Sequence, residues 1–282
     1  MIELAENRYG KSRVRLMKVL RGPEGNDLRE WMVQVLLTGD FELAHYEGDN
    51  SKILPTDTMK NTVYYVARRS QANSMEEYAK ELIDFLLKRN PQISSASVWV
   101  EAAMWKRLTV NGQAHPTSFM RGSGEVQTTR VSRKQNGEFQ VSSGLKNLVL
   151  MKTADSAFEG YIHDELTTLK ETSDRLFCTA LTAEWRYTMA SGDFNARRNA
   201  IREAMLSTFA HHKSKSVQET EYAMGKAALE IASDVDQIDL AMPNKHCLLV
   251  DLARFGEENP NEIFVPTDEP AGQIEVRVRR TG

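Results

Sequence analysis

The chain has little cysteine: its 282 residues include only Cys178 and Cys247. Two cysteines cannot build the disulfide framework of a small secreted domain, and they fit a reducing compartment better. No apolar run approaches the ~20 residues that a membrane-spanning helix needs. The first residues lack the apolar core of a signal peptide, and the last residues form no peroxisomal tripeptide. We therefore expect a cytoplasmic protein without a membrane partner.

The chain also lacks an excess of charge of either sign. It has 36 Lys and Arg against 39 Asp and Glu, a net charge of −3, and no basic block. A nucleic-acid partner is not expected, because phosphate binding needs clustered cations. Hydrophobic residues make up 41% and charged residues 27%, as in folded globular proteins. The length allows one large domain or two of about 140 residues.

The common cofactor motifs are missing. The six histidines occur in neither C-x-x-C nor H-E-x-x-H arrangements, so no metal site is predicted. The segment Gly122-Ser-Gly124 lacks the third glycine of a dinucleotide-binding loop, and there is no P-loop. The chain has no G-x-S-x-G nucleophile motif either. We expect no metal ion and no organic cofactor.

Long stretches with β-type patterns dominate what is present. The dipeptides Asn111-Gly112 and Asn136-Gly137 are hairpin signals between such stretches. Ser74 with Glu77, and Ser216 with Glu219, have the spacing of a capping box at a helix start. We predict strands at 12–21, 28–41, 93–110, 118–134, 138–152, 175–187, 236–252 and 262–280. We predict helices at 57–69, from 74 to about 89, at 193–211 and from 216 onward.

This order places two strands, two helices and two strands in each half of the chain. Because the strands do not alternate with single helices, the pattern predicts an α+β fold with antiparallel sheet rather than a parallel one. The predicted boundary divides the chain into 1–137 and 138–282. A sheet covered by helices on one face leaves edges that need protection, and a barrel closed by association of subunits would remove them.

Two predicted helix starts could hold a small anion. Thr56 could cap one helix with its hydroxyl, and Asp57 lies in the first turn. Val217 and Gln218 follow the cap Ser216 in the same way, and the free N–H groups at a helix start attract anions. Plain capping explains each helix start alone. Two further residues also have ordinary explanations by themselves. Arg175 could be a salt-bridged strand end, and His246 could be a buried residue of a strand, on the same face as Asn244. Lys11 alone is uninformative.

The joint pattern is more specific. Five segments resemble the motifs of the urate oxidase (uricase) family, in that family's order. A sixth, Asn259-Pro-Asn-Glu262 followed by Phe264, resembles its bacterial members. The five segments are Tyr9-Gly-Lys-Ser-Arg-Val-Arg15, the stretch from Gly48 to Tyr64, the stretch from Asp164 to Arg175, Ser216-Val-Gln218, and Pro243-Asn-Lys-His246.

The resemblance implies a tandem T-fold, with two units per chain. It implies a homotetramer, in which two subunits close a barrel and active sites lie at subunit interfaces. The implied reaction is the oxidation of urate by dioxygen and water to 5-hydroxyisourate and hydrogen peroxide, without a cofactor.

The resemblance also implies roles for individual residues. A substrate clamp would use Phe158 for stacking, Arg175 and Gln218 on opposite edges of the purine, and the N–H of Val217. Thr56 and Asp57 would reach the same urate from a neighbouring subunit. The implied proton relay comprises Lys11, Thr56 and His246, and Asn244 would hold water or dioxygen with Thr56.

Two alternatives remain open. One is a T-fold enzyme acting on a pterin or another purine-like substrate, and the missing Cys/His zinc pattern argues against a cyclohydrolase of this kind. The other is a purine-binding T-fold protein without catalysis. The joint presence of Lys11, Thr56, Asn244 and His246 argues against that alternative.

Overall fold

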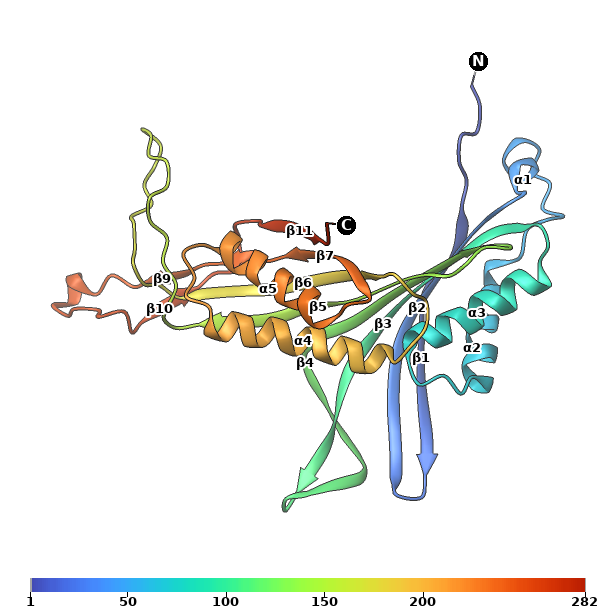
Figure 1. The fold of residues 1–282 in the computed structure, drawn as a ribbon, viewed down its shortest axis with the longest axis horizontal. Helices are drawn as coiled ribbons and strands as arrows, with labels where there is room; N and C mark the ends of the chain where they lie inside the picture. The colour runs from blue at the N-terminus through green and yellow to red at the C-terminus, as the bar shows by residue number, and fades with distance from the viewer. Residues whose placement is uncertain (1, 282) are drawn as a thin grey trace. The chain divides into compact units, whose positions relative to one another are not determined.

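The computed structural model describes residues 2–281 and divides into two compact units. The first unit comprises Met1–Gly144 and Arg186–Asn195, and the second comprises Leu145–Trp185 and Ala196–Gly282. Each unit combines antiparallel strands with helices packed against them (Figure 1). The predicted α+β class with antiparallel sheet is confirmed.

The first unit contains long strands in the order β1-β2-β3-β4, continued by the start of β5. Helix α2 packs on β1, while α3 packs on β3 and β4. Its elements are β1 (Tyr9–Gly22), β2 (Gly25–Gly39), α1 (Glu42–Tyr46), α2 (Thr56–Arg69), α3 (Met75–Arg89), β3 (Ile93–Val110), β4 (Gln113–Lys134) and the first residues of β5 (Gln140–Lys152). The short helix α1 has no counterpart among the predicted elements.

Tight turns set the register of these strands. In the β1–β2 hairpin Gly22 pairs with Gly25, whose φ of 141° suits glycine. Between β3 and β4, Asn111 and Gly112 have φ values of 52° and 76°, which is the geometry of a primed hairpin turn. The hairpin predicted from Asn111-Gly112 is confirmed.

The core of the first unit lies between the sheet and its helices. Alternate residues of β2, Val33, Val35 and Leu37, are fully buried, as the period of a strand requires. Met59 of α2 and Tyr78 of α3 cover them and are also fully buried. The hydroxyl of Tyr78 donates to the carbonyl of residue 63 at 3.0 Å, so the phenol is satisfied inside the core.

A β-bulge interrupts β1 close to its start. Lys11 lies opposite Val35 and Val14 opposite Val33, so β1 takes three steps where β2 takes two. Arg13, with φ 58°, accommodates the extra residue. Because side chains alternate along a strand, only this insertion lets Lys11 and Val14 point to the same, helix-covered face.

The helix starts differ in how they are capped. Ser74 accepts a hydrogen bond from the N–H of Glu77 at 3.2 Å, so the predicted cap of α3 is confirmed. The prediction that Thr56 caps α2 is wrong. Pro55 is the N-cap residue, no side chain caps this helix, and Thr56 is its first helical residue. The cause is Pro55, whose fixed φ and preference for extended backbone before the helix move the start by one residue.

The second unit has the strand order β5-β6-β7-β11, with β8 paired to β6, and β9 paired to β10 in a separate ribbon. Helix α5 packs on β7 and β11. Its elements are the rest of β5, β6 (Phe177–Tyr187), α4 (Phe194–His211), α5 (Val217–Ile231), β7 (Val235–Ala241), β8 (Asn244–Lys245), β9 (Cys247–Leu249), the 3-10 turn η1 (Ala253–Phe255), β10 (Phe264–Pro266) and β11 (Glu275–Arg279). Helix α4 and strands β5 and β6 each cross a boundary between the units.

Three strand predictions in this unit need correction. The stretch 236–252 forms three short strands rather than one, and 262–280 forms two. Asn244 exchanges hydrogen bonds with Gly272, at 2.7 and 3.3 Å, and the carbonyl of His246 accepts from Thr267. The backbone here therefore pairs with several short segments instead of one continuous partner strand. Asn244 and His246 therefore do not share the face of a single strand. Strand β6 begins at Phe177, so Arg175 precedes the strand instead of opening it.

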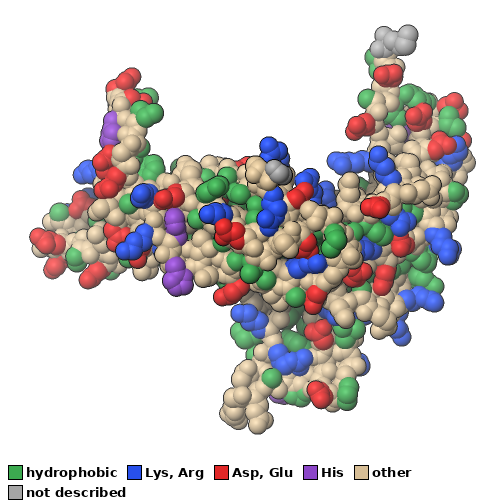
Figure 2. Space-filling model, viewed as in Figure 1, with side chains coloured by type: hydrophobic (Ala, Val, Ile, Leu, Met, Phe, Trp, Pro, Cys, Tyr) green, Lys and Arg blue, Asp and Glu red, His purple; other side chains and the backbone are tan. Residues whose placement is uncertain are grey.

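The surface has no dominant sign on the face shown in Figure 2, where Lys and Arg alternate with Asp and Glu. Within residues 2–281 no helix is long and apolar enough to cross a membrane.

Candidate functional site

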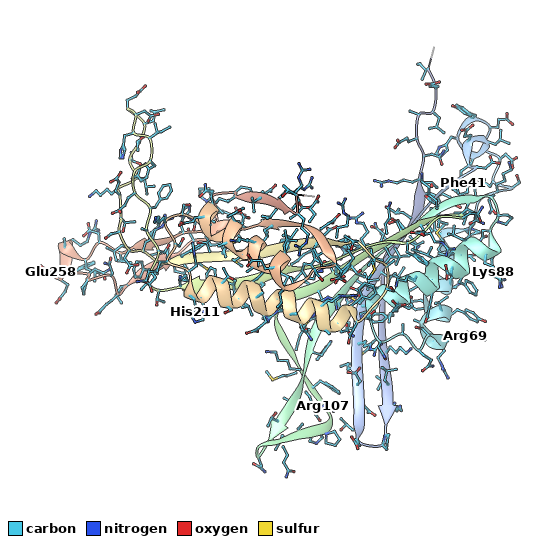
Figure 3. All side chains as sticks on the ribbon, in the orientation of Figure 1. Phe41, Arg69, Lys88, Arg107, His211 and Glu258 are labelled. Carbon is cyan, nitrogen blue, oxygen red and sulfur yellow. The ribbon has the colours of Figure 1, made fainter. Side chains whose placement is uncertain are left out.

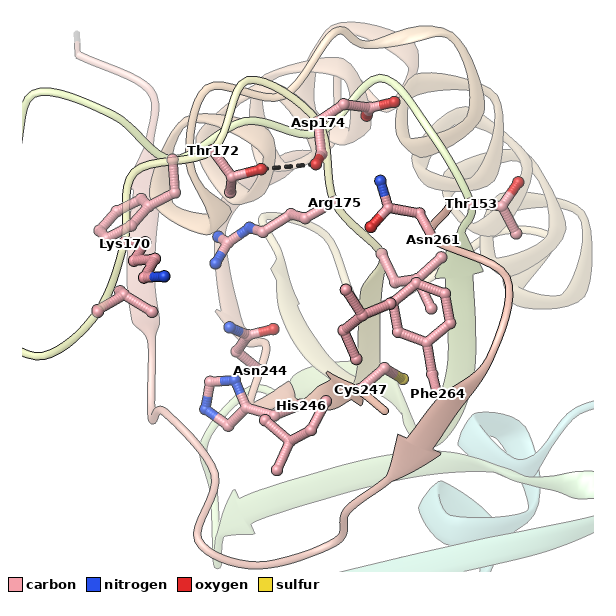
Figure 4. Close-up of a pocket in the computed structure, with 15 residues that line it drawn as sticks. Thr153, Lys170, Thr172, Asp174, Arg175, Asn244, His246, Cys247, Asn261 and Phe264 are labelled. Atoms are coloured by element: carbon pink, nitrogen blue, oxygen red, sulfur yellow. Dashed lines mark hydrogen bonds between the residues drawn. The ribbon is translucent and has the colours of Figure 1, made fainter. Parts of the chain in front are cut away.

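A cavity of about 270 Å³ in the second unit gathers several of the predicted residues (Figure 4). Phe158, Arg175, Asn244 and His246 all line it. They come from two segments of the chain: Phe158 and Arg175 lie near the two ends of the connection between β5 and β6, and Asn244 and His246 lie in or next to β8. The remaining walls are Thr153, Leu169, Lys170, Thr172, Asp174, Leu176, Cys247, Leu248, Leu249, Asn261 and Phe264.

Backbone hydrogen bonds hold Phe158 and Arg175 on adjacent segments. Phe158 exchanges hydrogen bonds with Thr172, from N–H to C=O in both directions, at 2.8 and 3.2 Å. The N–H of Arg175 donates to the carbonyl of Ser156 at 2.8 Å. Thr172 in turn donates from its hydroxyl to the carbonyl of Asp174 at 2.6 Å, the bond drawn in Figure 4. The two side chains are thus set by a short antiparallel ribbon.

The positive charge of the Arg175 side chain is half-buried and has no anionic partner among the described residues. Its guanidinium carbon lies 5.0 Å from the ring centre of Phe158, in cation–π contact. Its Nε is buried and has no hydrogen-bond partner among the described residues, and no described carboxylate pairs with it. Burial lowers the pKa of Arg175 from its usual value. The salt-bridged strand end considered from the sequence is therefore not what the structure contains.

Asn244 and His246 form the opposite wall. Figure 4 shows both side chains on the side of the cavity that faces the Arg175 guanidinium. The carbonyl of His246 is fixed by Thr267, whose N–H and hydroxyl donate at 2.8 and 2.9 Å. Asn244 pairs with Thr179 of β6 and with Gly272. The backbone of His246 is therefore held by Thr267, and that of Asn244 by both β6 and Gly272.

Val217 and Gln218 do not line the cavity but begin the helix next to its Phe158 segment. Ser216 caps α5 by accepting from the N–H of Glu219 at 3.1 Å, which confirms the predicted cap. Directly before it, Ser214 accepts from the N–H of residue 157 at 2.7 Å and donates to the carbonyl of Asp155 at 3.0 Å. The start of α5 and the segment carrying Phe158 thus run side by side.

The other predicted residues, Lys11, Thr56 and Asp57, lie in the first unit. Thr56 and Asp57 are exposed at the start of α2, and Lys11 is half-buried on β1. A hydrogen bond from Lys60, at 2.5 Å, holds the pKa of the Asp57 carboxyl below its usual range. The charge of Lys60 and, more weakly, that of Lys11 act in the same direction.

Sequence reasoning missed much of the cavity wall. Cys247, Leu248 and Leu249 follow the predicted His246, but Asn261 and Phe264 come from a later segment. No spacing in the sequence links residues 261–264 to Arg175. Among residues 2–281 no group of three or more His, Cys, Asp or Glu side chains could hold a metal ion.

The fold and this cavity define an α+β protein with antiparallel sheets and a cationic site, walled by one aromatic ring, that suits a small planar anion. The uricase family model matches residues 7–132 and 141–275. The uricase of Arthrobacter globiformis is 37% identical over 286 residues, covering 100% of this chain and 91% of that protein. The uricase of Dictyostelium discoideum is 37% identical over 284 residues, covering 100% and 99%.

Solved structures of uricases are also similar to this chain. The crystal structure of the uricase from Arthrobacter globiformis matches with a TM-score of 0.94 and 36% sequence identity, covering 100% of this chain and 96% of that one. The chain belongs to the uricase family. The family resemblance seen in the motifs and the predicted tandem T-fold class are confirmed.

Proposed function

We propose that this protein is a cofactor-independent urate oxidase. Urate, dioxygen and water give 5-hydroxyisourate and hydrogen peroxide. Two electrons leave the purine and reduce dioxygen to peroxide, which takes up two protons, while water supplies the hydroxyl that adds to the oxidised ring. The protein's tasks are to bind and orient urate, to move its protons, and to enclose the reacting dioxygen.

The observation that carries the proposal is the half-buried Arg175 beside Phe158. An unpaired cation in a partly buried place is unfavourable unless an anion binds there. Urate is a planar monoanion at neutral pH, with a carbonyl and a ring nitrogen spaced for a bidentate contact with a guanidinium. Stacking on Phe158 adds ~1–3 kcal/mol, by analogy with base–aromatic pairs.

The neighbouring residues complete the clamp. Gln218 holds the purine edge opposite Arg175, and the N–H of Val217 donates at the start of α5, where the helix dipole favours a negative charge. Asn244 holds water or dioxygen above the ring plane. His246, on the same wall, belongs to the proton relay.

Lys11 and Thr56 are the other members of that relay. Lys11 accepts a proton from urate, directly or through the Thr56 hydroxyl, which can both donate and accept. Asp57 and Thr56 contact the imidazole side of the purine. Lys11, Thr56 and Asp57 belong to the first unit and the cavity residues to the second, and this division supports a site completed by the first unit of another subunit.

The proposed assembly rests on the family resemblance, and the division of the residues between the two units supports it. We infer a homotetramer built from two barrels, each closed by two subunits whose T-fold units are 1–137 and 138–282. Head-to-tail closure of a two-fold pair brings the first unit of one chain to the second unit of its partner. The free thiols of Cys178 and Cys247 fit a reducing, cytoplasmic setting.

The direct test mixes the purified protein with urate in air, and follows the loss of urate's ultraviolet absorbance together with peroxide in a peroxidase-coupled assay. We expect one peroxide per urate consumed. Binding of urate without turnover would indicate the non-catalytic alternative. If the protein neither binds nor turns over urate but acts on a pterin, it is the alternative T-fold enzyme with a pterin or purine-like substrate. Arg175→Ala serves as the matched loss-of-binding control.

A further inference from the structure

The hydroxyl of Tyr9 makes two hydrogen bonds to one backbone residue across the first unit. It accepts from the N–H of Leu54 at 2.8 Å and donates to the carbonyl of Leu54 at 3.2 Å. The Tyr9 ring meets Phe41 edge-on, with 4.8 Å between ring centres and 86° between planes. Phe41, labelled in Figure 3, is itself 1% exposed. The phenol is therefore held by both its polar and its apolar parts.

The two ends of this contact lie next to the proposed proton relay. Tyr9 precedes Lys11 by two residues on β1, and the two side chains share the helix-covered face because side chains alternate along a strand. Leu54 precedes Thr56 by two residues. The Tyr9 hydroxyl thus joins the strand that carries Lys11 to the turn that delivers Thr56.

The turn before α2 is held by hydrogen bonds at several residues. Ile53 donates to the carbonyl of Asn50 at 3.0 Å, the Gln92 side chain donates to the carbonyl of Lys52 at 3.1 Å, and Tyr9 holds Leu54, two residues before Thr56. Helix α2 begins after Pro55 without a side-chain cap, whereas Ser74 and Ser216 cap α3 and α5. The preceding residues 47–55 form no strand or helix. The backbone N–H and C=O of Leu54, which would otherwise need water or a turn partner, are satisfied by Tyr9.

The strand side of the contact is rigid. A Cβ built on Gly10 would lie 1.8 Å from the carbonyl oxygen of Val35, so β1 and β2 are in close backbone contact between Tyr9 and Lys11. The bulge that follows at Arg13 ends this regular pairing. A hydroxyl fixed on such a strand can set the position of the Leu54 backbone.

We propose that Tyr9 is a positioning residue, whose hydroxyl sets the distance between Lys11 and Thr56 through the backbone of Leu54. This inference rests on the proposed function, because it concerns the relay that Lys11 and Thr56 form there. In this proposal Tyr9 acts through the Leu54 backbone and has no direct role toward urate or the reacting proton.

Tyr9→Phe removes only the hydroxyl and keeps the ring on Phe41. The chain offers a matched control: the Tyr64 hydroxyl, on α2, donates to the carbonyl of Arg15, on β1, at 3.2 Å. Tyr64→Phe therefore also removes a hydroxyl that bonds to backbone, between β1 and the helix that follows the turn, away from the relay. Both variants are assayed where circular dichroism shows them folded.

We expect Tyr9→Phe to lower kcat by about tenfold to a hundredfold, the range for a misplaced catalytic group, with a smaller change in KM. Tyr64→Phe should stay within about twofold of the unaltered protein on the same scale. In a Lys11→Met background, Tyr9→Phe should cost almost nothing further, because groups acting through one step are not additive. The same holds in a Thr56→Val background.

The outcomes separate the two proposals. If Lys11→Met and Thr56→Val keep near-normal turnover, the proposed relay is wrong, and the role of Tyr9 falls with it. If both lose turnover but Tyr9→Phe behaves like Tyr64→Phe, the relay stands and Tyr9 does not position it. A Tyr9→Phe loss that multiplies fully with the Lys11→Met loss would show that Tyr9 acts elsewhere, and would also overturn the inference.

Discussion

We expect Glu221 to make the stability of the second unit depend on pH. This residue of α5 is fully buried, and neither carboxylate oxygen has a hydrogen-bond partner among the described residues. The nearby N–H of Met242 is already committed to the carbonyl of Ile274 at 2.9 Å. Burial, followed by the charge of Glu275 on β11, raises the pKa of Glu221 from 4.5 to about 7.

The sign follows from proton binding. Between pH 4.5 and 7 the folded protein keeps a proton on Glu221 that the unfolded chain has lost, so folding takes up a proton. The contribution of this group to stability is fully present below pH 4.5 and is lost as pH rises through 7. The difference between the two pKa values corresponds to about 3 kcal/mol.

Glu221→Gln tests this directly, because glutamine is nearly isosteric and neutral at every pH. Relative to the unaltered protein, the variant should gain up to about 3 kcal/mol of unfolding free energy at pH 8 and much less at pH 5. A gain of this size raises Tm by roughly 5 °C for a chain of this length. Tm is measured by differential scanning fluorimetry from pH 5 to 8.

The control is Glu230→Gln on the same helix. Glu230 is exposed and pairs with Lys226 at 3.7 Å, so its loss should change stability by less than about 1 kcal/mol at any pH. If the Tm difference between Glu221→Gln and the unaltered protein is the same at pH 5 and pH 8, Glu221 does not titrate in this range. A variant that is less stable at pH 8 would show that the carboxylate is charged and paired, which contradicts the burial argument.

Further predictions concern substrate binding, packing, cofactors and assembly. Arg175→Ala should raise KM for urate by roughly 10- to 150-fold, the effect of ~1.5–3 kcal/mol for a lost charge-assisted contact, and should leave Tm almost unchanged; unfolding of this variant would make Arg175 a fold residue. Gly10→Ala should lower the unfolding free energy by about 2 kcal/mol or more, since its Cβ would collide with the backbone of β2, and an unchanged denaturant midpoint would refute the close contact. Dialysis against a strong chelator should leave urate turnover intact, and a loss that added metal restores would contradict a cofactor-free reaction. Co-refolding inactive Thr56→Val and Arg175→Ala chains should recover up to about a quarter of normal activity, if sites are shared between subunits that pair at random; hybrids that form without recovery would place each site within one chain.

Local signals in the sequence predict much of the fold. The caps Ser74 and Ser216, and the Asn111-Gly112 turn, act through neighbours within four residues, so their chemistry is visible in the sequence alone. The predicted cap at Thr56 is wrong because the prediction considered only the Thr56 hydroxyl. It left out the restraint that Pro55 places on the backbone at the helix start.

Contacts between segments far apart in the sequence could not be predicted in this way. Alternating patterns predict one strand at 236–252, but bonds from Gly272 and Thr267 divide it, and these partners lie more than 20 residues away. The site residues Phe158, Arg175, Asn244 and His246 could be proposed from the family motifs. Their joint cavity, and the tie between Tyr9 and Leu54, depend on pairings that no spacing reveals.

The extra residue in β1 makes chain length in this segment as informative as residue type. A relative with one residue fewer between the positions of Gly10 and Val14 would have its lysine two residues before its valine, on the same face of a regular strand, and would need no bulge. Conversely, the residue at position 13 must tolerate a left-handed backbone, so Asn or Gly there is a conservative change and a β-branched residue is not. A one-residue gap in this stretch therefore removes both the bulge and the backbone restriction at position 13, and leaves the lysine on the same face of the strand.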